Sequence, residues 1–220
     1  MRLWDGGIIY CLRHIFTLFE KVVNTLKFEI NDTALSFSPL GILFFSLLVY
    51  THSFVYSLAF FLSVITHEIG HFLAMKLLGE KTYGVSFTGR GISICSQGNA
   101  DEKEKLLFVL AGPVAGLILL ILCKFFDGLY FFRLLADITL RLTVLNLIPC
   151  LPLDGGNILL CTLKILFDEK ASTETGKIIS LHVCFISALT GILLLCCDKG
   201  IYFLLLSAFL CYFNMSEEYL

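Results

Sequence analysis

Charged residues are scarce in this sequence. Lysine, arginine, aspartate and glutamate make up 15% of its 220 residues, hydrophobic residues make up 57%, and the mean hydropathy is +0.87. Soluble domains carry about 25% charged residues, so this composition excludes an ordinary soluble domain and favours a membrane protein. The net charge is −2, which leaves no basic face to neutralise phosphates. We therefore expect no nucleic-acid partner.

Cysteine spacing typical of metal sites is also missing. None of the nine cysteines belongs to a CxxC pair, and most lie inside apolar runs. Cysteines in such surroundings are usually small buried hydrophobic residues. The sequence therefore supports neither a disulfide framework nor a cysteine nucleophile.

Long uncharged runs predict the membrane spans. The longest covers residues 33–67, and about 20 apolar residues suffice to cross the hydrocarbon core of a bilayer. This run divides most naturally at Thr51-His52-Ser53. We expect six spans, at residues 35–50, 54–78, 106–126, 130–148, 177–197 and 200–214.

Two further segments complete the predicted fold. Residues 8–26 place apolar side chains at helical spacing and charged ones elsewhere, which predicts an amphipathic helix on the membrane surface. Residues 79–97 are polar, contain glycine and partly alternate, which predicts a short β-hairpin at the membrane edge. The expected fold class is an all-α polytopic membrane protein with this hairpin. Its expected parts are residues 1–30 (surface helix), 31–167 (membrane core) and 168–220 (two C-terminal spans).

The distribution of lysine and arginine predicts the orientation. These residues gather in the N-terminal segment, around residues 76–105 and in residues 164–177, and they are sparse in the other connections. Positive residues favour the cytoplasmic side, so both termini should be cytoplasmic. The spans at residues 54–78 and 130–148 then run inward. Arg133, Asp137 and Arg141 share one face of the latter, where they either pair or serve a polar pathway, and we favour pairing.

The segment VITHEIGHFLA, residues 64–74, places ionisable side chains in an apolar helix. His67 and His71 are four residues apart, so a helix presents both imidazoles on one face, with Glu68 beside the first. This HExxH arrangement binds zinc and supplies a general base. The alternative is a helix end at which these polar side chains are hydrogen-bonded. Coordination of a metal ion would compensate more directly for the free-energy cost of burying them.

A catalytic zinc site needs a third protein ligand. His14 and His52 lie in the surface helix and the outer turn, away from the depth of the motif, whereas His182 stays a candidate. Asp154 is favoured, because the spans that carry the two motifs both run inward and place them near their inner ends. Asp154 could also cap the helix that follows, and the two roles are compatible. The prolines and glycines of NLIPCLPLDGG, residues 146–156, break a helix where it is buried in protein or lines a cavity.

Three motifs together resemble the site-2 protease family of intramembrane zinc metalloproteases. They are HEIGH at residues 67–71, NLIP at residues 146–149 and PLDGG at residues 152–156, and AGPVAG at residues 111–116 is also typical of that family. The resemblance covers residues 27–167. The compact six-span form without a PDZ insertion resembles the bacterial sporulation-factor branch, whose members process a membrane-associated sigma-factor precursor. We expect neither a PDZ nor a CBS domain.

The resemblance implies a function and a site. One Zn²⁺ per chain would be held by His67, His71 and Asp154, with Glu68 as the base. The implied substrate is a membrane-associated or single-pass membrane protein, cleaved in or next to its membrane segment near the cytoplasmic face. The bilayer and regulatory membrane proteins would be further partners. We expect Asn146 either to bind substrate backbone or the developing oxyanion, or to be only a polar helix end.

Two other functions use the same residues. A zinc or ion transporter could pass its cargo through His67, Glu68, His71 and Asp154, because ionisable residues inside a membrane often mark ion pathways. An inactive membrane scaffold could also keep the shape of a protease.

Overall fold

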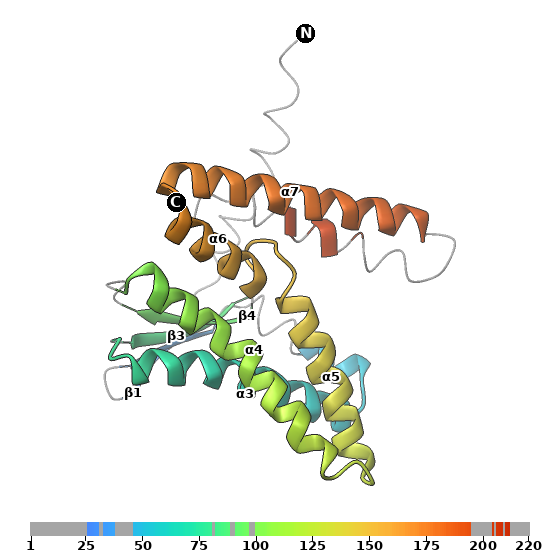
Figure 1. The fold of residues 1–220 in the computed structure, drawn as a ribbon. Coiled ribbons are helices and arrows are strands. Elements are labelled where there is room, and N and C mark those ends of the chain that lie inside the picture. The colour runs from blue at the N-terminus through green and yellow to red at the C-terminus, as the bar shows by residue number, and fades with distance from the viewer. Residues whose placement is uncertain are drawn as a thin grey trace. The chain divides into compact units, whose positions relative to one another are not determined.

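The computed structural model describes residues 26–30, 33–37, 46–80, 82–88, 91–96, 100–194, 204, 206–208 and 210–211. Residues 8–25 of the predicted amphipathic helix and most of the predicted span at residues 200–214 lie outside them. The chain divides into two compact units, residues 1–57 with 80–98 and residues 58–79 with 99–220. Figure 1 shows both as ribbons.

The first unit contains a four-stranded sheet of order β1-β2-β3-β4. β1 pairs antiparallel with β2, β2 pairs parallel with β3, and β3 pairs antiparallel with β4. The bounds are Leu26–Ile30 for β1, Thr33–Phe37 for β2, Thr82–Thr88 for β3 and Gly91–Ser96 for β4.

The sheet corrects two expectations. The all-α class is too narrow for this unit, and the span predicted from residue 35 cannot begin there because β2 continues to Phe37. Apolar and charged residues alternate from Leu26 to Ile30, which is the pattern of a strand. β2 is a strand because it pairs with β1 on one side and with β3 on the other. An uncharged run alone does not reveal such pairing. Residues 46–51 are helical, and the chain breaks at His52 and Ser53 as predicted.

Five helices follow in the described chain, and three of them are long and apolar enough to cross a membrane. These three are α3, α4 and α7; α5 is shorter and carries the three charged residues noted above. The bounds are Phe54–Leu77 for α3, Glu102–Lys124 for α4, Tyr130–Asn146 for α5, Asp154–Leu166 for α6 and Glu169–Leu193 for α7.

The helix surfaces suit a lipid environment. Many large apolar side chains of the three long helices are exposed, among them Ile65, Ile69 and Leu73 of α3, Ile118 and Ile121 of α4, and Phe185 and Ile186 of α7. Exposed apolar faces of this extent are unfavourable in water and favourable in hydrocarbon. On α5, Arg141 Nη2 lies 2.9 Å from Asp137 Oδ2, so the predicted pairing is seen for these two exposed side chains.

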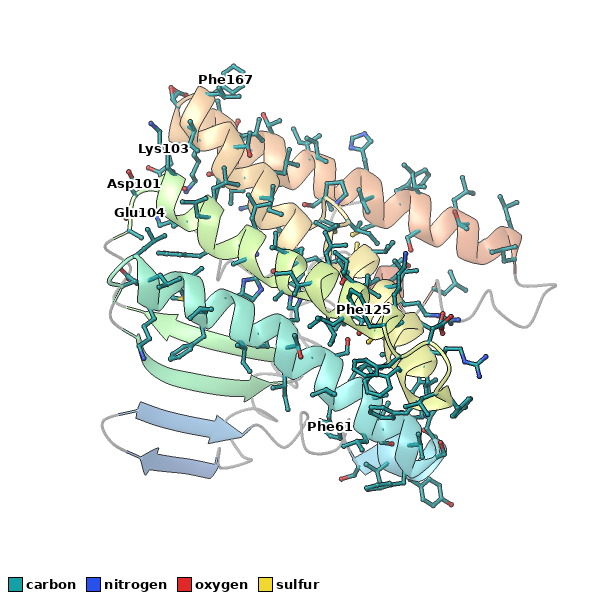
Figure 2. All side chains as sticks on the ribbon, turned by 60° about the horizontal axis from the view of Figure 1, so that its bottom comes forward. Phe61, Asp101, Lys103, Glu104, Phe125 and Phe167 are labelled. Carbon is teal, nitrogen blue, oxygen red and sulfur yellow. The ribbon has the colours of Figure 1, made fainter. Side chains whose placement is uncertain are left out.

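α4 begins at a reciprocal cap. The Asp101 carboxylate accepts the backbone N–H of Glu104 at 2.8 Å, and the Glu104 carboxylate accepts that of Asp101 at 3.0 Å. This capping box satisfies two N–H groups that the first turn leaves free. Figure 2 shows both side chains at one end of α4, with Phe125 at the other. α4 packs against α5 and α6, and α6 packs against α7.

The helix break between α5 and α6 is anchored on α7. The backbone N–H of Leu151 donates to the buried Ser180 hydroxyl at 3.1 Å. Cys150 is buried in a cluster with Cys184 and Leu210. Free thiols are found at Cys123, Cys150, Cys161, Cys184 and Cys211, and all of these except Cys211 are buried, as their apolar surroundings predict. These contacts fix the break, which directly precedes α6, against α7.

Candidate metal centre

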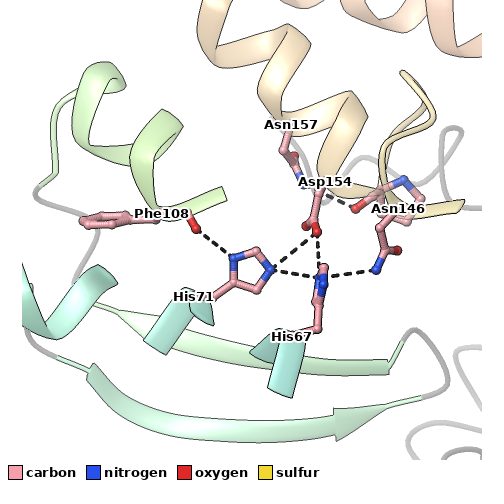
Figure 3. Close-up of polar contacts among 7 residues, drawn as sticks. His67, His71, Phe108, Asn146, Asp154 and Asn157 are labelled. Atoms are coloured by element: carbon pink, nitrogen blue, oxygen red, sulfur yellow. Dashed lines mark hydrogen bonds and ion pairs between the residues drawn. The ribbon is translucent and has the colours of Figure 1, made fainter. Parts of the chain in front are cut away.

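α3 supplies two of the three residues of the candidate centre. His67 and His71 lie one helical turn apart, and His67 is buried while His71 is partly buried. Asp154 comes from the first position of α6, after the helix break. Figure 3 shows the three side chains pointing toward one another.

The donor atoms converge closely. Asp154 Oδ2 lies 2.8 Å from His67 Nε2 and 3.4 Å from His71 Nε2, and the two Nε2 atoms are 3.2 Å apart. One donor atom from each residue fits within a span of 4.8 Å. Ligand atoms about 2.0–2.1 Å from a tetrahedral zinc ion lie about 3.3 Å from each other, so this spacing suits such an ion.

Hydrogen bonding also fits a metal. His71 Nδ1 lies 2.7 Å from the carbonyl oxygen of Phe108, which only accepts, so Nδ1 carries the proton. In the neutral imidazole Nε2 then holds a lone pair, and this lone pair faces the second imidazole and the Asp154 carboxylate. Metal-binding histidines usually donate their other N–H to a carbonyl or carboxylate in this manner. The residues present therefore fit a zinc ion.

The structure corrects the predicted capping role of Asp154. Leu153 is the N-cap of α6, no side-chain capping bond is present there, and Asp154 is the first helical residue. Its carboxylate is directed at the histidines. Asn157, one turn later, donates from its side chain to the carbonyl of Pro152 at 3.3 Å and so ties the helix to the preceding turn.

The other candidate histidines lie elsewhere. His182 is exposed on α7, and its Nδ1 lies 2.7 Å from the carbonyl of Ile178 in the same helix. His52 stacks on Tyr56 with ring centroids 4.4 Å apart. His14 lies outside the described residues. Within the described chain, the group suited to a metal is therefore His67, His71 and Asp154.

The two remaining predicted residues lie beside this group. Glu68 is partly buried next to His67 on α3. Asn146 ends α5, and its Nδ2 lies 3.3 Å from His67 Nε2. The long-range fold thus brings the end of α5 to the histidines of α3.

Gly112 belongs to the site in a way that the sequence does not reveal. A Cβ atom added to it would collide with His71 Nε2 and lie 2.9 Å from His67 Nε2. The bare backbone of α4 therefore makes room for both imidazoles. Its spacing from Gly116 indicates only close helix packing, because a small residue does not show what packs against it.

Comparison with known proteins gives concordant results. The model of peptidase family M50 matches residues 125–190. The zinc metalloprotease MJ0392 of Methanocaldococcus jannaschii is 31% identical over 166 residues, which cover 72% of this chain and 47% of the relative. A second curated relative, from Synechocystis, is 31% identical over 112 residues, 47% of this chain and 30% of the relative. The chain thus spans about half the length, or less, of these curated relatives.

A solved structure shares the fold. The site-2 protease from Methanocaldococcus jannaschii matches with a TM-score of 0.65 and 26% identity, over 87% of this chain and 94% of that chain. The apolar helices and the His67, His71 and Asp154 group are features of a membrane protein with a candidate metal-binding site. The chain is thus similar to peptidase family M50 over residues 125–190, to a zinc metalloprotease over about half of that relative's length, and to the fold of a site-2 protease.

Proposed function

We propose that this chain is an intramembrane zinc metalloprotease that hydrolyses a peptide bond in or next to the membrane segment of a membrane-associated protein. The observation that carries the proposal is the convergence of His67, His71 and Asp154 within 4.8 Å. These residues come from α3 and α6, so the group depends on the fold. We propose that they hold one Zn²⁺ per chain.

Each residue has a defined task in the proposed reaction. A bound zinc ion lowers the pKa of water and polarises a carbonyl. Glu68 takes the proton of the attacking water and later gives it to the leaving amine. Asn146 carries its amide beside His67 and donates to the substrate backbone or to the negative charge that develops on the scissile carbonyl oxygen.

The substrate has to be locally extended at the site. A transmembrane helix keeps its carbonyls in hydrogen bonds to its own backbone, so the scissile bond becomes accessible only after local unwinding. We propose a single-pass or membrane-associated protein as substrate. The finer form, a sigma-factor precursor under the control of regulatory membrane proteins, rests on the sequence resemblance alone. Cleavage of such a precursor on coexpression tests it, and an intact precursor beside a cleaved single-pass reporter would overturn the finer form only.

The proposed topology follows from the lysine and arginine distribution. It has six spans, both termini in the cytoplasm and the metal group toward the cytoplasmic side. Three apolar helices of sufficient length, in the described chain, support the multi-pass part of this topology.

Glu68→Gln tests the proposed chemistry. Glutamine keeps the shape of the side chain but cannot take a proton, so we expect cleavage of a single-pass reporter to fall at least about 100-fold while bound zinc is retained. The measurements are reporter cleavage and zinc content of the purified variant. Undiminished cleavage by Glu68→Gln would contradict the proposal. An ion transporter would instead show altered ion flux and no cleavage to lose.

A further inference from the structure

Three buried side-chain polar atoms of the described residues have no hydrogen-bond partner. They are Ser63 Oγ, His67 Nδ1 and Thr143 Oγ1. The three residues are 0%, 3% and 2% exposed. A buried polar atom without a hydrogen-bond partner is unfavourable, so each of these atoms indicates that a hydrogen-bond donor or acceptor binds beside it.

Ser63 and Thr143 differ from most other helix hydroxyls in the described chain. The usual bond runs from the hydroxyl to the carbonyl four residues earlier in the same helix. It is made by Ser57, Thr66, Thr139, Thr162, Ser172, Thr173 and Thr190. The hydroxyls of Ser63 and Thr143 do not make this bond.

The packing of α3 on α4 shows where Ser63 lies. His71 bonds to the carbonyl of Phe108, and both His71 and His67 lie against Gly112. The two helices run in opposite directions (Figure 1). This arrangement directs Ser63, one turn before His67, toward Gly116, one turn after Gly112.

The packing of α4 on α5 places Thr143 at the same level. A Cβ added to Gly116 would lie 2.5 Å from Thr143 Oγ1. On α5, Thr143 lies one turn before Asn146, whose amide contacts His67. The two hydroxyls thus lie in one layer among α3, α4 and α5, one helical turn from the metal group.

His67 needs an acceptor for the N–H group at its Nδ1. When its Nε2 is a ligand, its Nδ1 carries a proton that must be donated. The Nδ1–H group of His71 donates a hydrogen bond to the carbonyl of Phe108, whereas His67 Nδ1 has no hydrogen-bond partner. Ser63 lies four residues earlier on the same helix face, and its hydroxyl has no partner, so it can serve this role.

We propose that His67, Ser63 and Thr143 form a binding site for one buried water molecule. The water accepts a hydrogen bond from the Nδ1–H group of His67 and forms hydrogen bonds with both hydroxyls, which gives it the three bonds typical of a buried water. Ser63 and Thr143 are then positioning residues that fix the ring of His67 through this water. The inference rests on the proposed zinc site and adds residues to it that are not ligands.

The test compares hydroxyl removal with matched controls. Zinc affinity is measured by chelator competition on the full-length protein in nanodiscs. We expect Ser63→Ala and the nearly isosteric Thr143→Val to bind zinc about tenfold more weakly, the size of effect seen when the outer partner of a metal-binding histidine is lost. Thr143→Ser keeps the hydroxyl and should stay near wild type. Thr139→Val removes a buried hydroxyl that bonds only its own helix, and it should also stay near wild type.

The outcomes separate this inference from the proposed function. Unchanged affinity in Ser63→Ala and Thr143→Val, or equal weakening by Thr139→Val, would overturn the water site while leaving the protease proposal standing. A wild-type protein that binds no zinc would overturn both. A high-resolution structure of the zinc-loaded wild type needs no variant: an ordered water bonded to all three atoms supports the site, and a direct bond between Ser63 and His67 without water overturns it.

Discussion

The geometry of the candidate site depends on the residues around it, which orient the donor atoms and leave space for the imidazole rings. His71 is oriented by a backbone carbonyl, so its Nε2 faces the other donors. Asp154 is the first residue of α6, after the N-cap Leu153, and its carboxylate faces them. Gly112 leaves the space that both rings occupy. Ligand type alone therefore does not make the site, and its neighbours decide where each donor atom points.

Gly112→Ala tests the tight fit against the imidazoles. The added methyl group would collide with His71 Nε2, so one of the rings has to move. We expect at least about a tenfold loss of zinc affinity, since a small displacement of a ligand is enough to weaken a metal site. Gly128→Ala is the matched control, because a Cβ there has no atom within 4 Å. Equal zinc affinity in both variants would contradict the described packing.

At the scale of elements, the break between α5 and α6 is a positioned structure. Residues 147–153 form the break between Asn146 and Asp154. They contact Ser180 and Cys184 of α7, and Cys150 of the break is buried in a cluster with Cys184 and Leu210. Helix α7 thus supports Asp154 without contributing a donor of its own to the candidate metal group.

Ser180→Ala tests this support. Without its acceptor, the buried N–H of Leu151 loses a hydrogen bond, which costs about 1–3 kcal/mol of stability. We expect a lower unfolding temperature and slower reporter cleavage, with thermal unfolding and cleavage assays as the measurements. Thr190→Val removes a hydroxyl on the same helix that bonds only its own backbone, so it is the control. A Ser180→Ala variant as stable and active as that control would show that the break does not need α7.

The sequence predicts the helices well where one residue pattern decides them. α3 ends one residue from its predicted end, because a long apolar run leaves few alternatives. The HExxH spacing also predicts that His67 and His71 share a face. By contrast, the sequence predicts the start of a span where the structure has β2, since strand pairing with residues far along the chain is not visible in one segment. The roles of Gly112 and Ser180 likewise depend on tertiary contacts between helices.

At the scale of the whole molecule, apolar helix surfaces enclose a small polar centre. The exposed side chains of α3, α4 and α7 are largely hydrophobic, whereas the buried set includes His67, Ser63 and Thr143. A soluble protein shows the opposite distribution. This inversion suits a chain that uses lipid as its outer solvent and buries its chemistry between helices.

The proposed orientation can be measured with reporter fusions. In a bacterial host, a fluorescent protein that folds only in the cytoplasm should be bright when fused after Leu220. An alkaline phosphatase that is active only outside should be active when fused after Gly128, between α4 and α5. The reverse pattern at both positions would contradict the lysine and arginine argument.

The zinc content of the purified protein tests the central claim most directly. Metal analysis should find about one zinc ion per wild-type chain and a large loss in Asp154→Ala, because two histidines alone leave the site short of a ligand. His182→Ala, which changes an exposed histidine outside the metal group, should keep its zinc. A wild-type chain without zinc, or an Asp154→Ala variant with full zinc content, would contradict the account.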